Sequence, residues 1–171
     1  MKILITGSSG FIGFHLSKLL LEKGNSIYGV DSMNNYYDVN LKKARLDILK
    51  KYKKFNFSKA NLENSKRIKT IFNKVKPKVV IHLAAQAGVR YSIDKPKVYL
   101  KSNIDGTFNI IEASNEIKVK HLIMASSSSV YGANKKIPFK EIDKTETQLS
   151  IYAATKKANE SMAHAYSNIW N

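Results

Sequence analysis

Two residues near the end of the chain have the chemistry of an acid–base pair. Tyr152 and Lys156 stand four residues apart, and residues at this spacing on a helix face the same way. A nearby ammonium group favours the phenolate form of a tyrosine, so Tyr152 is expected to act as a base near neutral pH. Such a pair is common by chance. Here a serine run, residues 126–129, precedes it at the end of an expected strand, where open α/β sheets bind ligands.

A glycine-rich turn at the start of the chain has the pattern of a phosphate-binding loop. Gly7 permits a tight turn, Gly10 lets a pyrophosphate approach the backbone, and Gly13 lets helix and strand pack closely. The helix that follows offers unpaired N–H groups and a positive dipole end. Asp31 ends the second expected strand and can accept hydrogen bonds from adenosine ribose hydroxyls. A carboxylate there repels a 2′-phosphate, so the sequence favours NAD over NADP.

Short β-branched runs alternate with helical patterns, which predicts an α/β fold with a Rossmann-like, doubly wound parallel sheet. Right-handed crossovers predict the strand order 3-2-1-4-5. The expected strands are Lys2–Thr6, Ser26–Asp31, Phe55–Ala60, Lys78–Ala84 and His121–Ser126.

Helices are expected between these strands, each from a stripe of apolar residues. The stripes are Ile12, Leu16, Leu19 and Leu20; Leu41, Ala44, Ile48 and Tyr52; and Ile68, Ile71, Phe72 and Val75. A further long helix is expected to start near Pro96, and the last to cover about Ser150 to Asn168. No repeat or linker divides the chain, so residues 1–171 are expected to form one NAD-binding domain.

The composition narrows the classes of partner. The net charge is +16, but only 3 of the 29 basic residues are Arg and the Lys residues are spread along the chain. Nucleic-acid recognition favours Arg, so a solvated Lys-rich surface is the preferred interpretation. The absence of Cys and the spacing of the four His residues argue against a metal site. His82, inside an apolar strand, is expected to be a core residue. The apolar N-terminus is too short for a signal peptide or membrane span, so a cytoplasmic protein is expected.

On these motifs the chain resembles the extended short-chain dehydrogenase/reductases, which include NAD-dependent epimerases and dehydratases. They combine the glycine motif with a Ser/Thr, Tyr-x-x-x-Lys triad. The resemblance covers all 171 residues. It is strongest to the UDP-glucuronate 4-epimerases, through Asn35–Val39, His82–Ser92, Ala125–Gly132 and Ser150–Glu160.

The resemblance implies roles for the triad residues. Tyr152 would be the catalytic base, and Lys156 its electrostatic partner and a ligand of the nicotinamide ribose. Ser127 would hydrogen-bond the reacting hydroxyl, and Asn103 would support the site. Arg90 would either pair with a carboxylate or diphosphate of the substrate or anchor its own loop, and both alternatives stay open. Further cofactor contacts are implied at Phe11, Ile12, Asn61, Leu62, Leu83, Ala84 and Ala85. At Asn61 relatives usually carry an Asp that receives the adenine amino group.

Ser128 and Ser129 favour one branch of this family. Dehydratases that resemble this chain place Asp and Glu at these positions, and UDP-glucuronate decarboxylases have Glu just before Val-Tyr-Gly. Serines cannot do carboxylate acid–base work at neutral pH, but their hydroxyls can donate to a substrate carboxylate. The resemblance therefore implies C4 epimerisation of a UDP-sugar, UDP-glucuronate to UDP-galacturonate. A UDP-glucose-type epimerase and an inactive NAD-binding fragment remain alternatives.

The length of the chain adds a further expectation. Family members are about twice as long and are implied to be homodimers. We therefore expect this chain to be their N-terminal half without the substrate domain, with its activity alone left open.

Overall fold

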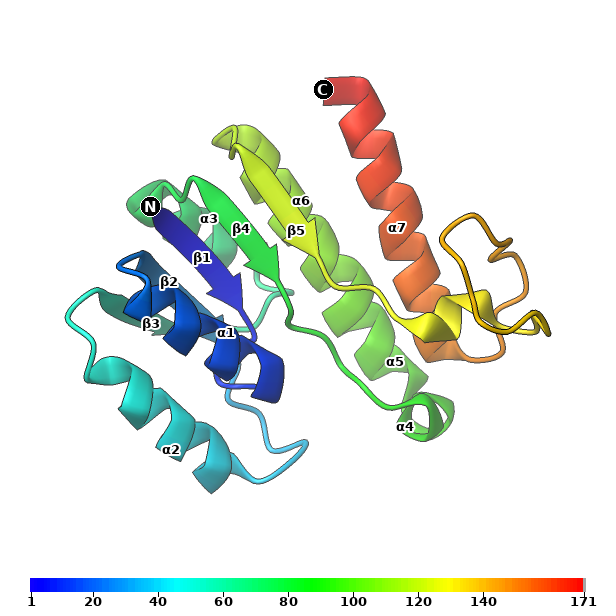
Figure 1. Cartoon of the computed structure of the whole chain (residues 1–171), viewed down its shortest axis with the longest axis horizontal. Coiled ribbons are helices and arrows are strands. Elements are labelled where there is room, and N and C mark those ends of the chain that lie inside the picture. Colours follow the sequence, from blue (N-terminus) through cyan, green and yellow to red (C-terminus); the bar gives the residue numbers. More distant parts are fainter. Residues whose placement is uncertain (171) are drawn as a thin grey trace. The chain divides into compact units, whose positions relative to one another are not determined.

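All five strands expected from the apolar runs are present in the computed structural model, which describes residues 1–170. They run parallel in the order β3-β2-β1-β4-β5, which confirms the predicted topology (Figure 1). Their bounds are β1 Lys2–Thr6, β2 Ser26–Asp31, β3 Phe55–Lys59, β4 Val79–His82 and β5 His121–Met124.

The last three strands are shorter than the sequence predicted. Thr6, the last residue of β1, pairs with His82, and His82 pairs with Met124. Beyond Thr6 the backbone turns at Gly7, whose φ is +73°. β4 therefore loses its neighbour after His82, and β5 loses its own in turn. The residues between the observed and the predicted ends of these strands, 60, 83–84 and 125–126, lie in loops.

The described residues divide into two compact units. Unit 1 comprises Met1–Ala84 and Asn109–Met124, and unit 2 comprises Ala85–Phe108 and the chain from Ala125 onward. The helices of unit 1 are α1 (Phe11–Glu22), α2 (Val39–Lys50), α3 (Ser65–Val75) and most of α6 (Gly106–Glu116). Unit 2 contains α4 (Val89–Asp94), α5 (Pro96–Tyr99), a π-helical segment Leu100–Asp105, a 3₁₀ turn Ser128–Tyr131 and α7 (Ile151–Trp170).

Two apolar clusters cover opposite faces of the sheet in unit 1. Successive strand residues point to opposite faces, so Leu4 and its neighbours Ile3 and Ile5 enter different clusters. The Leu4 cluster includes residues of α3 and α6, and the Ile3–Ile5 cluster includes residues of α1 and α2. The sheet is therefore covered on both faces, as a doubly wound fold requires.

The structure corrects the predicted inner faces of α1 and α2. The α3 stripe is confirmed, because all four of its members are buried. In α1, Ile12 and Leu19 are 64% and 49% exposed. The helix instead buries Gly13, Phe14, Ser17 and Leu21. The physical reason is the small pair Gly13 and Ser17, which allows close approach on that side.

The inner face of α2 is also rotated from the predicted stripe. Leu46 and Leu49 are buried, whereas Leu41 and Ile48 are exposed. Lys42 is buried because its ammonium group reaches the carbonyl and side-chain oxygens of Asn34, both at 2.8 Å. Its aliphatic stem can then cover apolar surface.

The helices of unit 2 begin close to their expected positions. Pro96 is the first residue of α5, and α7 starts at Ile151. The chain from Pro96 to Glu116 is helical throughout, with the π-helical segment between α5 and α6. None of the helices within residues 1–170 is both long enough and apolar enough to cross a membrane.

Candidate functional site

The glycine turn of unit 1 is as tight as the sequence predicted. Gly7 adopts φ +73°, and its N–H donates to the Val30 carbonyl at 2.7 Å. A Cβ atom on Gly7 would lie 2.9 Å from the Ala84 nitrogen. The next turn contact is the N–H of Gly10, which donates to the Gly7 carbonyl at 3.0 Å. Any larger residue at position 7 would need both a strained backbone and a displaced neighbour.

Gly13 packs against the turn itself. A Cβ atom there would lie 2.1 Å from the Gly7 carbonyl oxygen. The close packing expected at Gly13 therefore involves the first residue after β1. This contact holds the start of α1 directly against the turn.

The turn and the start of α1 fit a diphosphate. Gly10 caps α1 without a side-chain hydrogen bond, so the first N–H groups of the helix have no intrahelical partner. Within residues 1–170, the hydroxyls of Ser8 and Ser9 are buried and have no hydrogen-bond partner. The Phe11 and Ile12 side chains are exposed. Unpaired donors at a helix N-terminus are suited to bind phosphate oxygens.

Asp31 lies beside this turn. The side chain is 8% exposed; Oδ2 accepts from the Ser9 N–H at 3.0 Å and Oδ1 from the Met33 N–H at 2.9 Å. Each carboxylate oxygen can accept a second hydrogen bond. Asp31 is thus held in a fixed orientation and retains acceptor capacity for a hydroxyl group.

The segment after β2 supplies contacts that the sequence analysis missed. Both the Tyr37 hydroxyl and the Arg45 guanidinium donate to the Ser9 carbonyl, at 3.4 and 3.5 Å. Lys42 lies 4.3 Å from the centre of the Tyr37 ring. Burial lowers the pKa of Lys42, and the charge of Asp31 partly opposes that shift. Tyr37 lies in the stretch Asn35–Val39 that carries the family resemblance, but its contact with the turn arises only in the folded chain.

A hollow of about 660 Å³ lies at the end of β3, and Asn61 is in its lining. The remaining lining residues are Lys59, Ala60, Glu63, Asn64 and Arg67. Asn61 is exposed, whereas Leu62 is 6% exposed and its carbonyl accepts from Asn109 at 2.8 Å. Asn61 can therefore present its side chain to a ligand, and Leu62 belongs to the core.

Thr6 organises the end of β4. Its hydroxyl lies 2.7 Å from Nδ1 of His82 and accepts from the N–H groups of Leu83 and Ala84 at 3.2 and 3.1 Å. His82 is 5% exposed. The prediction that His82 is a hydrogen-bonded core residue is confirmed.

Tyr152 and Lys156 lie one turn apart on α7 in unit 2. Lys156 is 6% exposed, and its ammonium group donates to the Ala125 carbonyl at 2.9 Å. Burial lowers the pKa of Lys156. The half-buried Tyr152 packs edge-to-face with Tyr99, at 6.1 Å between ring centres. Tyr99 is itself buried and donates to the carbonyls of Ala87 and Gly88. The phenol ring of Tyr152 therefore has a fixed neighbour.

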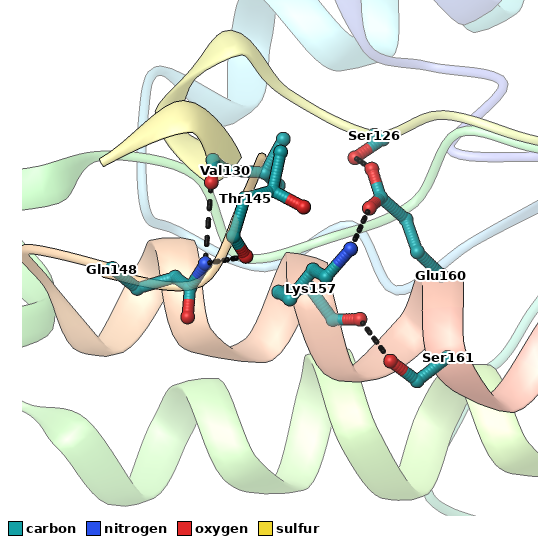
Figure 2. Close-up of polar contacts among 7 residues, drawn as sticks. All are labelled: Ser126, Val130, Thr145, Gln148, Lys157, Glu160 and Ser161. Carbon is teal, nitrogen blue, oxygen red and sulfur yellow. Dashed lines mark hydrogen bonds and ion pairs between the residues drawn. The ribbon is translucent and has the colours of Figure 1, made fainter. Parts of the chain in front are cut away.

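The serine run forms a hydrogen-bonded turn in the same unit. Ser127 is extended, and its hydroxyl accepts from the Ser129 N–H at 3.2 Å. Ser127 and Ser129 are half-buried and Ser128 is exposed. Gln148 donates to the Val130 carbonyl at 3.2 Å (Figure 2). The serine run therefore presents hydroxyl groups on a turn that these hydrogen bonds stabilise.

Asn103 joins three parts of unit 2. It lies fully buried in the π-helical segment. Its side chain accepts from the Gln86 N–H at 2.7 Å and donates to the Gln86 carbonyl and the Thr155 hydroxyl, both at 3.1 Å. These contacts are what a supporting role requires, since they connect the segment after Ala85 to α7.

Arg90 lies on α4 and is exposed. Its side chain is accessible to an anionic ligand, and its proposed substrate contact stays a prediction.

Glu160 is a polar residue of α7 that the sequence analysis did not single out. Figure 2 shows its carboxylate between Ser126 and Lys157, with oxygen–oxygen and oxygen–nitrogen distances of 2.5 and 3.3 Å. Glu160 follows Lys156 by four residues. This spacing places it on the same helical face as Tyr152, and that was the signal in the sequence that could have identified it.

The predicted site residues thus fall into two sets. Unit 1 contains Gly7, Gly10, Phe11, Ile12, Gly13, Asp31, Asn61, Leu62, Leu83 and Ala84. Unit 2 contains Ala85, Arg90, Asn103, Ser127, Ser128, Ser129, Tyr152 and Lys156. Among residues 1–170 there is no group of three or more His, Asp or Glu side chains that could hold a metal ion.

Comparison with known proteins places this geometry among sugar-nucleotide enzymes. The family model described as GDP-mannose 4,6 dehydratase matches residues 4–171. Protein CapI of Staphylococcus aureus is 53% identical over 171 residues, which are 100% of this chain and 51% of that protein. A probable UDP-glucuronate 4-epimerase of Rhizobium meliloti is 47% identical over 170 residues, 99% of this chain and 50% of that protein.

Solved structures show the same similarity. The UDP-glucuronic acid 4-epimerase of Bacillus cereus, crystallised with UDP-glucuronic acid and NAD, superposes with a TM-score of 0.90 at 33% identity. The match covers 99% of this chain and 53% of that one. The chain thus spans about half the length of the relatives that it matches.

Proposed function

This chain belongs to the NAD-dependent epimerase/dehydratase family that the GDP-mannose 4,6 dehydratase model describes, and we propose that it carries the cofactor-binding and acid–base residues of a UDP-glucuronate 4-epimerase. The observation that supports this choice most is the turn of unit 2 at Ser127–Ser129, which offers hydroxyl groups where a dehydratase needs carboxylates. The similarity to enzymes named as UDP-glucuronate 4-epimerases agrees with it.

The residues of unit 1 fit NAD as the cofactor. The unpaired N–H groups at the start of α1 suit the pyrophosphate. Asp31 has acceptor capacity for the adenosine ribose hydroxyls, and Asn61 would accept from the adenine amino group. When bound, NAD would supply reversible hydride transfer at C4 of the sugar, with no net consumption of the cofactor.

The residues of unit 2 would manage the proton and the orientation of the sugar. Tyr152 would take the proton of the 4-hydroxyl group and return it after the 4-keto sugar has rotated in the site. The ammonium group of Lys156 would be its electrostatic partner, and the Ser127 hydroxyl would hydrogen-bond the reacting oxygen. Ser128 and Ser129 would donate to the carboxylate at C5, and Arg90 would pair with a carboxylate or diphosphate.

The carboxylate of Glu160, which bonds Ser126 just before this turn, does not contradict an epimerase. Glu160 accepts from Ser126 and pairs with Lys157, so each of its oxygens has a partner. A carboxylate held in this way is poorly placed to exchange protons with a sugar. Elimination of water or loss of CO₂ would need an additional acid or base.

The direct test is to incubate the whole purified protein with UDP-glucuronate and NAD and to separate the products by anion-exchange chromatography. We expect UDP-galacturonate, formed reversibly and without net reduction of NAD. UDP-xylose would instead indicate decarboxylation. Turnover of UDP-glucose but not UDP-glucuronate would make the protein an epimerase for neutral sugars, and no turnover of any of these nucleotide sugars would refute the proposal. Sedimentation of the same sample would test the homodimer, which stays a prediction.

A further inference from the structure

Two consecutive residues after β5 are held by two residues of α7. Lys156 donates to the Ala125 carbonyl at 2.9 Å, and the Ser126 hydroxyl donates to Oε1 of Glu160 at 2.5 Å. Lys156 and Glu160 are four residues apart and therefore one turn apart on the same face of the helix. The chain between β5 and the serine turn is thus fixed at both a backbone and a side-chain position.

The same face of α7 carries Tyr152, one turn before Lys156. The residue that follows the two held positions is Ser127, whose hydroxyl starts the 3₁₀ turn by accepting from Ser129. Fixing Ala125 and Ser126 on α7 therefore limits where the Ser127 hydroxyl can lie relative to the phenol of Tyr152. The positions of the Ser127 hydroxyl and the Tyr152 phenol therefore both depend on the same helix, α7.

The contact between Ser126 and Glu160 is the shorter of the two that Glu160 makes. An O–H donor to a carboxylate at this distance is a charge-assisted hydrogen bond. The second contact, to Lys157 at 3.3 Å, involves side chains that are 34% and 36% exposed. Ion pairs this exposed contribute little to stability. The shorter distance and the O–H donor therefore favour Ser126 as the residue that the Glu160 carboxylate holds.

We propose that Glu160 is a positioning residue: through Ser126 it sets the place of Ser127 relative to Tyr152. The expected effect on kcat rests on the epimerase function proposed above. The expected effect on the position of residues 126–131 does not. Glu160 itself would touch neither substrate nor cofactor.

The kinetic test compares Glu160→Ala, Glu160→Gln, Ser126→Ala and the double variant Ser126→Ala/Glu160→Ala in the whole protein. A misplacement of about 1 Å can cost about 100-fold in rate. We expect kcat to fall about 10- to 100-fold in Glu160→Ala, with KM for UDP-glucuronate and the Kd of NAD within about 2-fold of the parent. Ser126→Ala should give a similar loss, and the double variant should be no worse than either single one. Glu160→Gln should recover part of the rate, because the amide oxygen can still accept from Ser126.

Two exposed positions provide matched controls. Glu141→Ala removes a carboxylate from a loop, and Ser161→Ala removes a hydroxyl that donates only to the Lys157 carbonyl of its own helix (Figure 2). Both should leave kcat unchanged. If Glu160→Ala does not fold, Ser126→Ala decides the question, since Ser126 is exposed and its truncation removes the same bond.

A second measurement separates this inference from the proposed function. Amide hydrogen exchange should become faster at residues 126–131 in Glu160→Ala and in Ser126→Ala, and stay unchanged in the two controls. Unchanged exchange together with unchanged kcat in both variants would overturn the inference. If the parent protein turned over no nucleotide sugar, the proposed function would fail, and the exchange experiment alone would still decide whether Glu160 positions this segment.

Discussion

The ammonium nitrogen of Lys156 lies 2.9 Å from the carbonyl oxygen of Ala125, a residue 31 positions earlier in the chain. This bond uses one of the three donors of the side chain, so two N–H donors are not used by Ala125. Because the ammonium group is buried, its pKa is lowered. The lysine is thus both a structural donor and an electrostatic group, and these two properties can be measured separately.

Replacing Lys156 by Met should change how stability depends on pH. The folded-state pKa of Lys156 lies below the value of 10.5 for the unfolded chain. Between these two pKa values the unfolded chain binds more protons, so the free energy of unfolding of the parent rises with pH. Relative to Lys156→Met, the parent should therefore gain stability as the pH rises toward 10.5. Urea unfolding at several pH values measures this, with the exposed Lys101→Met as control. A constant difference between parent and Lys156→Met would contradict it.

Tyr152→Phe should abolish most turnover and leave the fold and NAD affinity intact. The substitution removes the group proposed to take the proton but keeps the ring that packs on Tyr99. General bases contribute about 10²- to 10⁴-fold, and we expect a loss in that range. Tyr166→Phe, on the same helix, is the matched control. Near-normal activity in Tyr152→Phe would mean that the proton leaves by another route.

Asp31→Asn should weaken NAD binding by about 10-fold, because a neutral amide accepts from ribose hydroxyls less strongly than a carboxylate. It should also narrow the preference for NAD over NADP, since the repulsion of a 2′-phosphate is removed. Calorimetry with both cofactors measures each effect, and the exposed Asp47→Asn should change neither. Equal binding of NAD and NADP by the parent protein would show that Asp31 does not select the cofactor.

Gly13→Ala should lower the free energy of unfolding by about 1–3 kcal/mol, the usual cost of overpacking. The added Cβ would meet the Gly7 carbonyl at 2.1 Å, so α1 or the turn must move. Leu19→Ala, on the same helix but half-exposed, should cost less than about 1 kcal/mol. Denaturant unfolding of both variants tests the corrected face of α1. Equal losses of unfolding free energy in the two variants would indicate that Leu19 is buried.

The strands and α3 were predictable because their patterns are local. The apolar runs of β1, β2 and β4 alternate with helical patterns, which is enough to predict a parallel sheet. The apolar residues of α3 lie on one face only, so its buried side is unambiguous. α1 has apolar residues nearly all round, so its period alone could not select the buried side. In α1 the buried side is the one that carries the small residues Gly13 and Ser17, and it depends on which part of the fold packs against them.

The sequence by itself determined the chemical groups and their local frames: the glycine turn before α1, Asp31 at the end of β2, and Tyr152 and Lys156 one turn apart on α7. These relationships follow from backbone geometry over a few residues. Only the tertiary structure decided that Lys156 meets Ala125 and that Glu160 meets Ser126, over separations of 31 and 34 residues. Contacts over such distances depend on how a helix packs against a loop, and no local preference of either segment encodes that packing.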